Sequence, residues 1–228
     1  MTTNRREILP VPPASVIRKL PAMGDLMITA KQNGATHERI GTVETVSIED
    51  GWLVCGGAAH DSRIDPTLIT SVIIDRTSVM QEKVYPRIDF RRGEEVLFSV
   101  VGFAGIEPFD AALAEFGPGE ALPEEPKEPR AKREDASLED AGALPLQAAL
   151  EAGTKVSIGF RRPGFEQNWT GVIESVKPAM GFINVMRSDF HLHLLANTVS
   201  SWNDGGALDA DGVPTGLSLT LHDETVPA

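Results

Sequence analysis

Residues 24–53 read GDLMITAKQNGATHERIGTVETVSIEDGWL, and residues 154–183 read TKVSIGFRRPGFEQNWTGVIESVKPAMGFI, so a second copy of the stretch begins 130 positions further on. The alignment extends without a gap over residues 24–72 and 154–202. Its identical pairs are Ile28/Ile158, Gly34/Gly164, Gly41/Gly171, Glu44/Glu174, Val46/Val176, Gly51/Gly181 and Ser71/Ser201. The glycine pairs mark backbone positions rather than surface chemistry, and the apolar matches keep the phase of a strand. So long and sparse a repeat predicts a duplicated domain rather than a solenoid.

Both copies have the pattern of β-strands. Apolar and β-branched runs cover residues 26–30, 40–48, 52–55, the segment around 63–64 and 68–74 in the first copy, and residues 156–160, 172–176, 182–186, 190–195 and 198–202 in the second. Gly34, Gly41 and Gly51 fall between the runs, where turns or bulges are needed. The pattern therefore predicts two β-rich units.

The segments around the copies differ from them in composition. A hairpin is predicted at residues 88–90 and 96–98, followed by a helix at 107–116 and a second helix at 144–152. Between the helices, prolines and charged residues cannot bury enough apolar surface to offset their ordering entropy. We therefore predict an N-terminal arm (1–15), a first repeat (16–116), a flexible linker (117–143) and a truncated second repeat (144–228) that lacks one strand and a covering helix.

Composition excludes several classes of function. The formal charge of −12 argues against nucleic acid as a partner, because phosphate binding needs a basic surface. No apolar run approaches the roughly 20 residues that span a bilayer, so membrane insertion is not expected. No secretion signal is visible, which favours the cytoplasm. Cys55 is the only cysteine, and its apolar surroundings favour a buried side chain.

Several stretches together resemble the HemS/ChuX family of heme-utilization and hemin-degrading proteins in its two-repeat form. The resemblance covers residues 16–116 and 144–222, and it lies in the order and spacing of the stretches rather than in one sharp motif. The stretches are LPAMGDLM (20–27), GATHERIG (34–41), VETV (43–46), HDSRIDP (60–66), FDAAL (109–113), PGFEQNWTG (163–171), GFINV (181–185) and SDFHLHL (188–194).

The resemblance implies an α+β fold of two β-rich repeats, with large stacked antiparallel sheets and few marginal helices. It also implies heme as the cofactor, bound in a cleft between sheet and helices. Family members pass heme to a heme oxygenase or open the ring themselves. Two-repeat members carry their axial histidine on a helix between the repeats, in a segment Asp-x-His-x-Phe-Phe. Here residues 117–150 contain no histidine, so that ligand has no counterpart.

Three residues are therefore candidates for heme binding. Arg63 matches a family arginine that pairs with a heme propionate, and a guanidinium suits a carboxylate because it can donate two parallel hydrogen bonds. An arginine in a surface strand is the alternative. His193 occupies the equivalent position in the second copy, where a structural histidine is the alternative. His60 is the remaining axial candidate by chemistry, with a solvent-facing loop residue as the alternative.

Two further histidines, His191 and His37, are not assigned to a binding site. His191 and His193 are two apart and so share one face of a strand, but no carboxylate of matching phase lies nearby in sequence, and no metal site is predicted. His37, beside Glu38 and Arg39, has the setting of a turn residue. No hydrolytic motif is present, and no catalytic residue is assigned.

The sequence leaves three functions open. The first is a cytoplasmic heme-binding and heme-trafficking protein in heme iron utilization, with a heme oxygenase or a heme transporter as partner. The alternative is a HemS/ChuX-fold binding or structural module that has lost heme binding. The third is a heme-degrading enzyme. Exposed strand edges in a shortened second copy also favour a homodimer.

Overall fold

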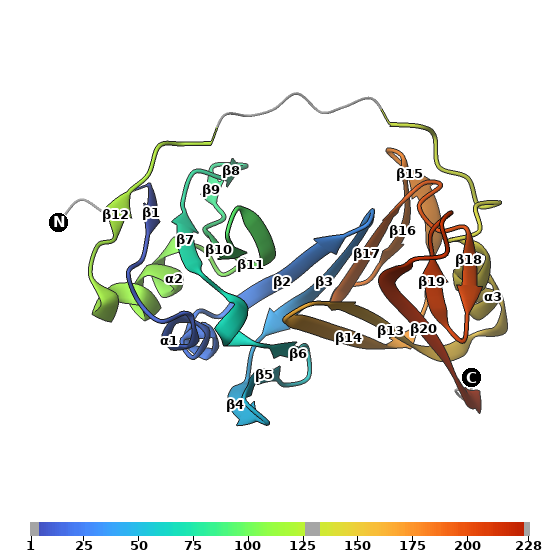
Figure 1. Cartoon of the computed structure of the whole chain (residues 1–228), viewed down its shortest axis with the longest axis horizontal. Coiled ribbons are helices and arrows are strands. Elements are labelled where there is room, and N and C mark those ends of the chain that lie inside the picture. The colour runs from blue at the N-terminus through green and yellow to red at the C-terminus, as the bar shows by residue number, and fades with distance from the viewer. Residues whose placement is uncertain (1–4, 126–132, 226–228) are drawn as a thin grey trace. The chain divides into compact units, whose positions relative to one another are not determined.

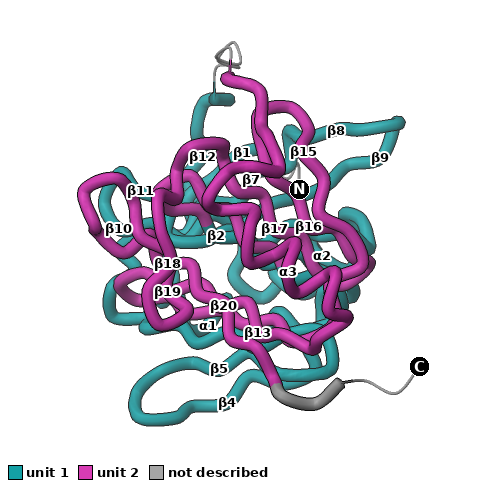
Figure 2. The backbone as a smooth tube through the Cα atoms, turned by 90° about the vertical axis from the view of Figure 1, so that its right-hand side faces the viewer, with its two compact units in different colours: residues 1–30, 39–129 teal, residues 31–38, 130–228 magenta. Residues whose placement is uncertain are grey.

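The structure is a computed structural model that describes residues 5–125 and 133–225. The chain forms two compact units, drawn in different colours in Figure 2. Unit 1 comprises residues 1–30 and 39–129, and unit 2 comprises residues 31–38 and 130–228. Residues 31–38 belong to the first copy in sequence but pack within the unit that holds the second copy.

Unit 1 is built on an antiparallel sheet with the strand order β12-β1-β7-β10-β11-β2 (Figure 1). The strands are β12 (Glu120–Ala121), β1 (Arg6–Ile8), β7 (Ser71–Asp75), β10 (Arg87–Arg92), β11 (Glu95–Gly102) and β2 (Asp25–Gln32). The hairpin predicted at residues 88–90 and 96–98 is confirmed, and Phe90 faces Phe98 across it with ring centroids 4.4 Å apart.

Helices cover the apolar face of this sheet. They are α1 (Pro13–Ile17), η1 (Leu20–Ala22), α2 (Ile106–Leu113) and η3 (Ala114–Phe116), so the helix predicted at residues 107–116 is confirmed. Phe109 and Leu113, which lie one turn apart on an apolar stripe of α2, are buried, as are Val16, Ile17 and Leu20. Burial of this stripe holds α2 in place, because a helix this short is marginal alone.

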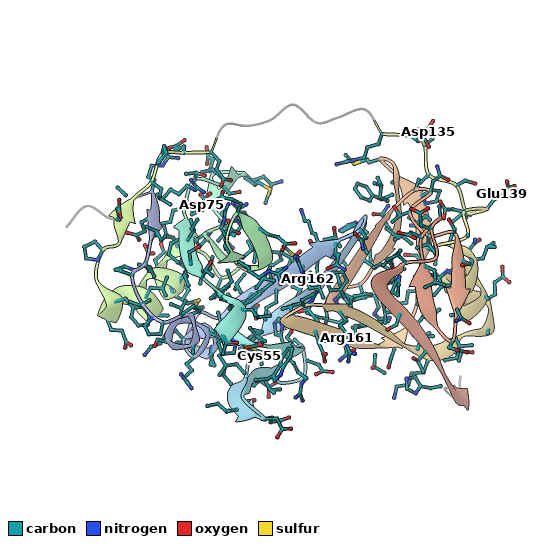
Figure 3. The ribbon with its side chains drawn as sticks, in the orientation of Figure 1. Cys55, Asp75, Asp135, Glu139, Arg161 and Arg162 are labelled. Atoms are coloured by element: carbon teal, nitrogen blue, oxygen red, sulfur yellow. The ribbon has the colours of Figure 1, made fainter. Side chains whose placement is uncertain are left out.

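A smaller meander completes the described part of unit 1. It consists of β4 (Thr45–Glu49), β5 (Trp52–Gly56) and β6 (Asp61–Ile64), followed by η2 (Pro66–Leu68), and a separate hairpin pairs β8 (Val79–Met80) with β9 (Lys83–Val84). Cys55, labelled in Figure 3, is fully buried on β5, as predicted.

Unit 2 contains two groups of antiparallel strands. One has the order β18-β19-β20-β13-β14, and the other has the order β3-β17-β16-β15. The strands are β3 (Ala35–Thr42), β13 (Thr154–Arg162), β14 (Phe165–Val172), β15 (Val176–Ala179), β16 (Phe182–Met186), β17 (Phe190–Leu195), β18 (Ser201–Asn203), β19 (Gly206–Leu208) and β20 (Pro214–Thr225). Helix α3 (Leu144–Ala152), at the predicted residues, packs against β13 and β15.

The two strand groups of unit 2 enclose an aromatic core. Trp169 of β14 stacks on Phe190 of β17, with ring centroids 4.6 Å apart and planes 7° from parallel. His37 lies beside Phe190 at 4.9 Å and is fully buried. His37 is therefore a core residue rather than the turn residue expected, because it shares the inward phase of β3 with Ala35 and Arg39.

The duplication seen in the sequence is also present in the structure. Adding 130 to β2, β3, β4, β5, β6 and β7 gives the positions of β13, β14, β15, β16, β17 and β18. Equivalent turns share unusual backbone angles, since Asp50-Gly51 has φ values of 50° and 84° and Met180-Gly181 has 55° and 82°. Gly34 and Gly164 likewise have φ values of 77° and 84°. Two of the three aligned glycine pairs thus mark turns that recur in both copies, whereas Gly41 and Gly171 lie within β3 and β14 rather than between strands as predicted.

Some predicted boundaries are wrong. The predicted strands 40–48 and 172–176 each span the end of one strand and the start of the next, around Val43 and Ile173. β1 lies in the predicted N-terminal arm, and β12 lies in the predicted linker, whose central residues 126–132 are outside the described part of the chain. β12 pairs with β1 through backbone groups, which its proline-rich surroundings do not prevent.

The strand expected to be missing from the second copy is present. β18, β19, β20 and β13 follow the order of β7, β10, β11 and β2. The connection between β7 and β10 contains the β8–β9 hairpin, whereas Asp204 and Gly205 alone join β18 to β19. The connections between strands are therefore shorter in the second copy. For this reason the constant offset of 130 residues between the two copies ends after β18.

Candidate functional site

The predicted heme-binding residues are divided between the units. His60 and Arg63 lie at β6 in unit 1, and His193 lies on β17 in unit 2. Their individual surroundings differ in burial and in hydrogen bonding, and those differences decide what each side chain can do.

His60 is not the solvent-facing residue that the sequence left open, because only 2% of its surface is exposed. Its Nε2 lies 2.9 Å from the Gly41 carbonyl oxygen, to which it donates a hydrogen bond. Burial lowers the pKa of His60 below its usual value, and the charge of Arg39 contributes in the same direction. Nδ1 is buried and has no hydrogen-bond partner among the described residues. His60 is therefore a neutral, enclosed imidazole.

Arg63 lies on the surface of β6, and 34% of its side chain is exposed. Its Nη1 donates to Glu49 Oε2 at 3.1 Å. The guanidinium has five N–H donors, so this ion pair leaves others for a carboxylate ligand. A role in binding a propionate remains a prediction.

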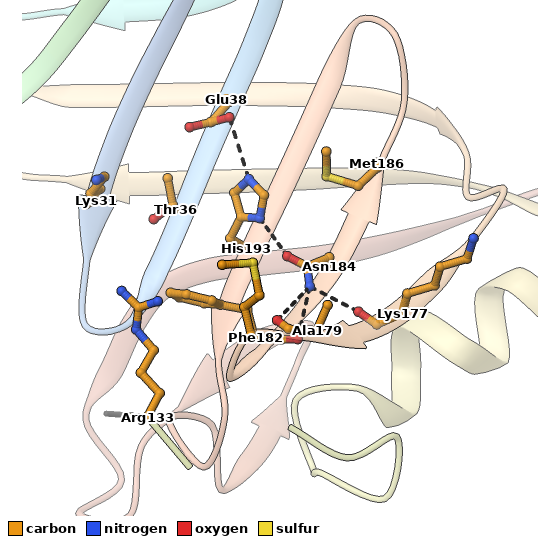
Figure 4. A pocket seen from close by; sticks show the side chains of 11 residues that line it. Lys31, Thr36, Glu38, Arg133, Lys177, Ala179, Phe182, Asn184, Met186 and His193 are labelled. Carbon is orange, nitrogen blue, oxygen red and sulfur yellow. Dashed lines mark hydrogen bonds and ion pairs between the residues drawn. The ribbon is translucent and has the colours of Figure 1, made fainter. Parts of the chain in front are cut away.

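His193 lines a cavity of about 560 Å³ on one face of the β3-β17-β16-β15 group (Figure 4). This volume falls within the range of roughly 300–1,000 Å³ typical of small-molecule sites. Strand alternation explains the set of side chains, because Thr36 and Glu38 share the outward phase of β3, and Phe182, Asn184 and Met186 share that of β16. The remaining lining residues are Lys31, Arg133, Lys177, Ala179 and Met180.

The cavity wall combines apolar and cationic groups. Phe182 and Met186 provide apolar surface beside His193, while Lys31, Arg133 and Lys177 carry positive charge. The Arg133 guanidinium lies over the Phe182 ring, 4.5 Å from its centroid. Such a cavity suits a ligand that combines apolar surface with carboxylates.

Asn184 fixes the orientation of His193. Its Nδ2 donates to the carbonyl oxygens of Phe182 and Lys177, at 3.0 and 3.1 Å. Its Oδ1 therefore faces His193, whose Nδ1 lies 2.6 Å away and donates to it. The other ring nitrogen, Nε2, therefore faces away from Asn184 and toward Glu38.

Glu38 lies against both histidines of β17. Its Oε2 is 3.2 Å from His191 Nδ1 and 3.7 Å from His193 Nε2. Burial raises the pKa of Glu38, but hydrogen bonds and charge interactions with His191 and His193 outweigh that effect and lower the pKa to about 2. Glu38 is therefore ionised at neutral pH.

The sequence pointed to His193 and His191, but not to the Glu38 and Asn184 side chains beside them. Glu38 precedes His191 by 153 residues, and the two meet because β3 pairs with β17. The only local signal was that Glu38 has the outward phase of β3. Asn184 is adjacent through strand pairing, since it lies directly opposite His193 between β16 and β17. The carboxylate that the sequence analysis did not find beside the histidines is thus supplied by the first copy.

No protein-family model matches the sequence, and no curated protein matches it significantly. Solved structures do match. ChuS, a heme oxygenase of Escherichia coli, superposes with a TM-score of 0.74 at 17% identity, over 96% of this chain and 84% of that one. Holo-PhuS, a heme-binding protein of Pseudomonas aeruginosa, superposes with a TM-score of 0.71 at 17% identity, over 96% of this chain and 82% of that one.

The chain therefore has the two-repeat, strand-dominated fold of ChuS and PhuS, with large antiparallel sheets and few helices. The resemblance to the HemS/ChuX family predicted from the sequence is confirmed at the level of the fold. Among the described residues, no helix has the length and apolarity required to cross a bilayer.

Proposed function

We propose that this chain is a cytoplasmic heme-binding protein that carries heme in heme iron utilization. The observation that carries the proposal is a shared fold over nearly the whole chain with ChuS and PhuS, which are described as a heme oxygenase and a heme-binding protein. Because one fold can host unrelated functions, the proposal also needs a site with suitable chemistry.

The cavity beside His193 supplies such chemistry. Heme has a flat apolar ring, two carboxylates and an iron that binds imidazole. Phe182 and Met186 suit the ring, Lys31 and Arg133 suit the carboxylates, and His193 presents an imidazole. His60 is less suited, because its ring is enclosed and hydrogen-bonded to the backbone. Of the predicted residues, His193 is therefore the preferred iron ligand and Arg63 a candidate propionate partner.

A hemin titration of the full chain, read by absorbance, tests the site. We expect a saturable Soret shift for the unmodified chain. In His193→Ala the affinity for hemin should fall at least ~10-fold. His222→Ala is the matched control, because His222 is a histidine of unit 2 that bonds Ser157 at 2.8 Å and does not line the cavity. Equal weakening in both variants, or in neither, would remove His193 from the proposal.

The second candidate is a module of the same fold that has lost heme binding. Two observations favour it. Residues 117–150 contain no histidine, and Arg63, the predicted partner of a propionate, already forms an ion pair with Glu49. Absence of any saturable Soret shift at micromolar hemin would support this candidate.

If heme binds, incubation with ascorbate separates heme carriage from heme degradation, because only degradation removes the Soret band. A heme oxygenase or transporter as partner, and a homodimer, remain proposals.

A further inference from the structure

Glu38, His191 and His193 form a cluster in unit 2, and the proposed heme carriage uses only His193 of the three. One potential ligand atom from each residue lies within 4.8 Å of the others. We infer that these three side chains form a binding site for a divalent transition metal ion of the zinc class. The inference goes beyond the proposed function, because it concerns the chain without heme.

The backbone holds the three side chains on one face. His191 and His193 alternate outward from β17 while Phe190, Leu192 and Leu194 point into the core. Glu38 projects from β3 on the same side, at 3.2 Å from His191 Nδ1 and 3.7 Å from His193 Nε2. Tetrahedral zinc bound at about 2.0–2.1 Å needs ligand atoms roughly 3.3 Å apart. The cluster therefore requires only small side-chain rotations to close on an ion.

The hydrogen bonding of His193 points to a cation. Asn184 holds Nδ1 as the donor, at 2.6 Å, so Nε2 is the ring nitrogen left to bind a proton or a metal ion. Nε2 lies 3.7 Å from the carboxylate of Glu38, which is an acceptor. A cation between the two atoms, either a proton on Nε2 or a metal ion, stabilises this arrangement. A histidine metal ligand usually donates its second N–H to a carboxylate, a backbone carbonyl or water, and the Asn184 Oδ1 accepts that hydrogen bond here.

The ligand types select the class of metal. Two imidazoles and one carboxylate are typical of zinc and of other first-row divalent ions, whereas calcium and magnesium prefer oxygen ligands alone. Three protein ligands leave at least one coordination position open toward the cavity. Lys31 and Lys177 line that cavity, so an anionic group is favoured at the open position.

Calorimetric titration of the heme-free, chelator-treated full chain with zinc chloride tests the inference. We expect one zinc ion per chain, and cobalt(II) in its place should give visible absorption bands of tetrahedral or five-coordinate geometry. His191→Ala and Glu38→Gln should each weaken zinc binding by more than ~100-fold. Asn184→Leu should weaken it by ~10–100-fold, because the orienting hydrogen bond is lost.

Matched controls separate a built site from adventitious binding. His222→Ala and Glu166→Gln change the same residue types in unit 2 outside the cluster, and both should bind zinc like the unmodified chain. Circular dichroism of each variant verifies folding. Absence of zinc binding would overturn the inference and leave a proton between His193 and Glu38 as the explanation. Zinc binding that survives both His191→Ala and Glu38→Gln would overturn it equally. Because no hemin is present, neither outcome bears on heme carriage.

Discussion

His60 illustrates how a single residue can make stability depend on pH. Its usual pKa is 6.5, and burial lowers the value in the folded chain. Below pH ~6.5 the unfolded chain therefore binds more protons at this position than the folded chain does. Stability contributed by neutral His60 is present above that pH and is lost as the pH falls toward the lowered folded pKa.

We predict that His60→Gln, whose amide can still donate to Gly41, reduces the fall in stability between pH 7.5 and 5.5. Urea unfolding at the two pH values measures the effect. His222→Gln is the control, because His222 is a partly exposed histidine of unit 2 that bonds Ser157, and it should keep the original dependence on pH. An unchanged dependence in His60→Gln would show that other groups are responsible.

At the scale of elements, the two copies offer matched turns. Met180 adopts a φ of 55° before Gly181, and Asp50 adopts 50° before Gly51. Aspartate and asparagine tolerate this left-handed conformation, whereas methionine is strained in it. We predict that Met180→Asn stabilises the chain by up to about 1 kcal/mol. Asp50→Ala should destabilise it, and urea unfolding of both variants provides the measurement. Destabilisation by Met180→Asn would indicate that its side chain contributes packing in the cavity.

A buried ion-pair network joins three elements of unit 1. Arg76, which follows β7, donates to Glu7 of β1 at 2.7 Å and to Asp110 of α2 at 2.8 Å. The Glu7 side chain is only 3% exposed, so removal of its partner leaves a buried charge. We predict that Arg76→Ala lowers the free energy of unfolding by about 3–5 kcal/mol.

Arg161→Ala is the control for that prediction, because Arg161 is 75% exposed and pairs with Glu166 on the surface of β14. Its loss should change the free energy of unfolding by no more than about 1 kcal/mol. Thermal or urea unfolding measures both variants. Similar effects in the two would contradict the assignment of the Arg76 network to the buried core.

Across the whole molecule, the sequence predicted the features that are encoded locally. The paired glycines at positions 34 and 164 and at 51 and 181 located recurrent turns, and an apolar stripe located α2. Features that depend on pairing between distant segments were missed. Glu38 meets His191 only because β3 pairs with β17, and His37 is buried only because β14 and β17 cover it. Strand β20 was missed because shorter connections ended the regular offset between the copies.

The proposed function requires that the fold shared with ChuS and PhuS binds heme in this chain. Titration of the chelator-treated full chain with hemin, followed at the Soret band, tests that claim most directly. Saturation at one heme per chain with micromolar or tighter affinity is the predicted result. A linear, unsaturated increase that matches free hemin would contradict it.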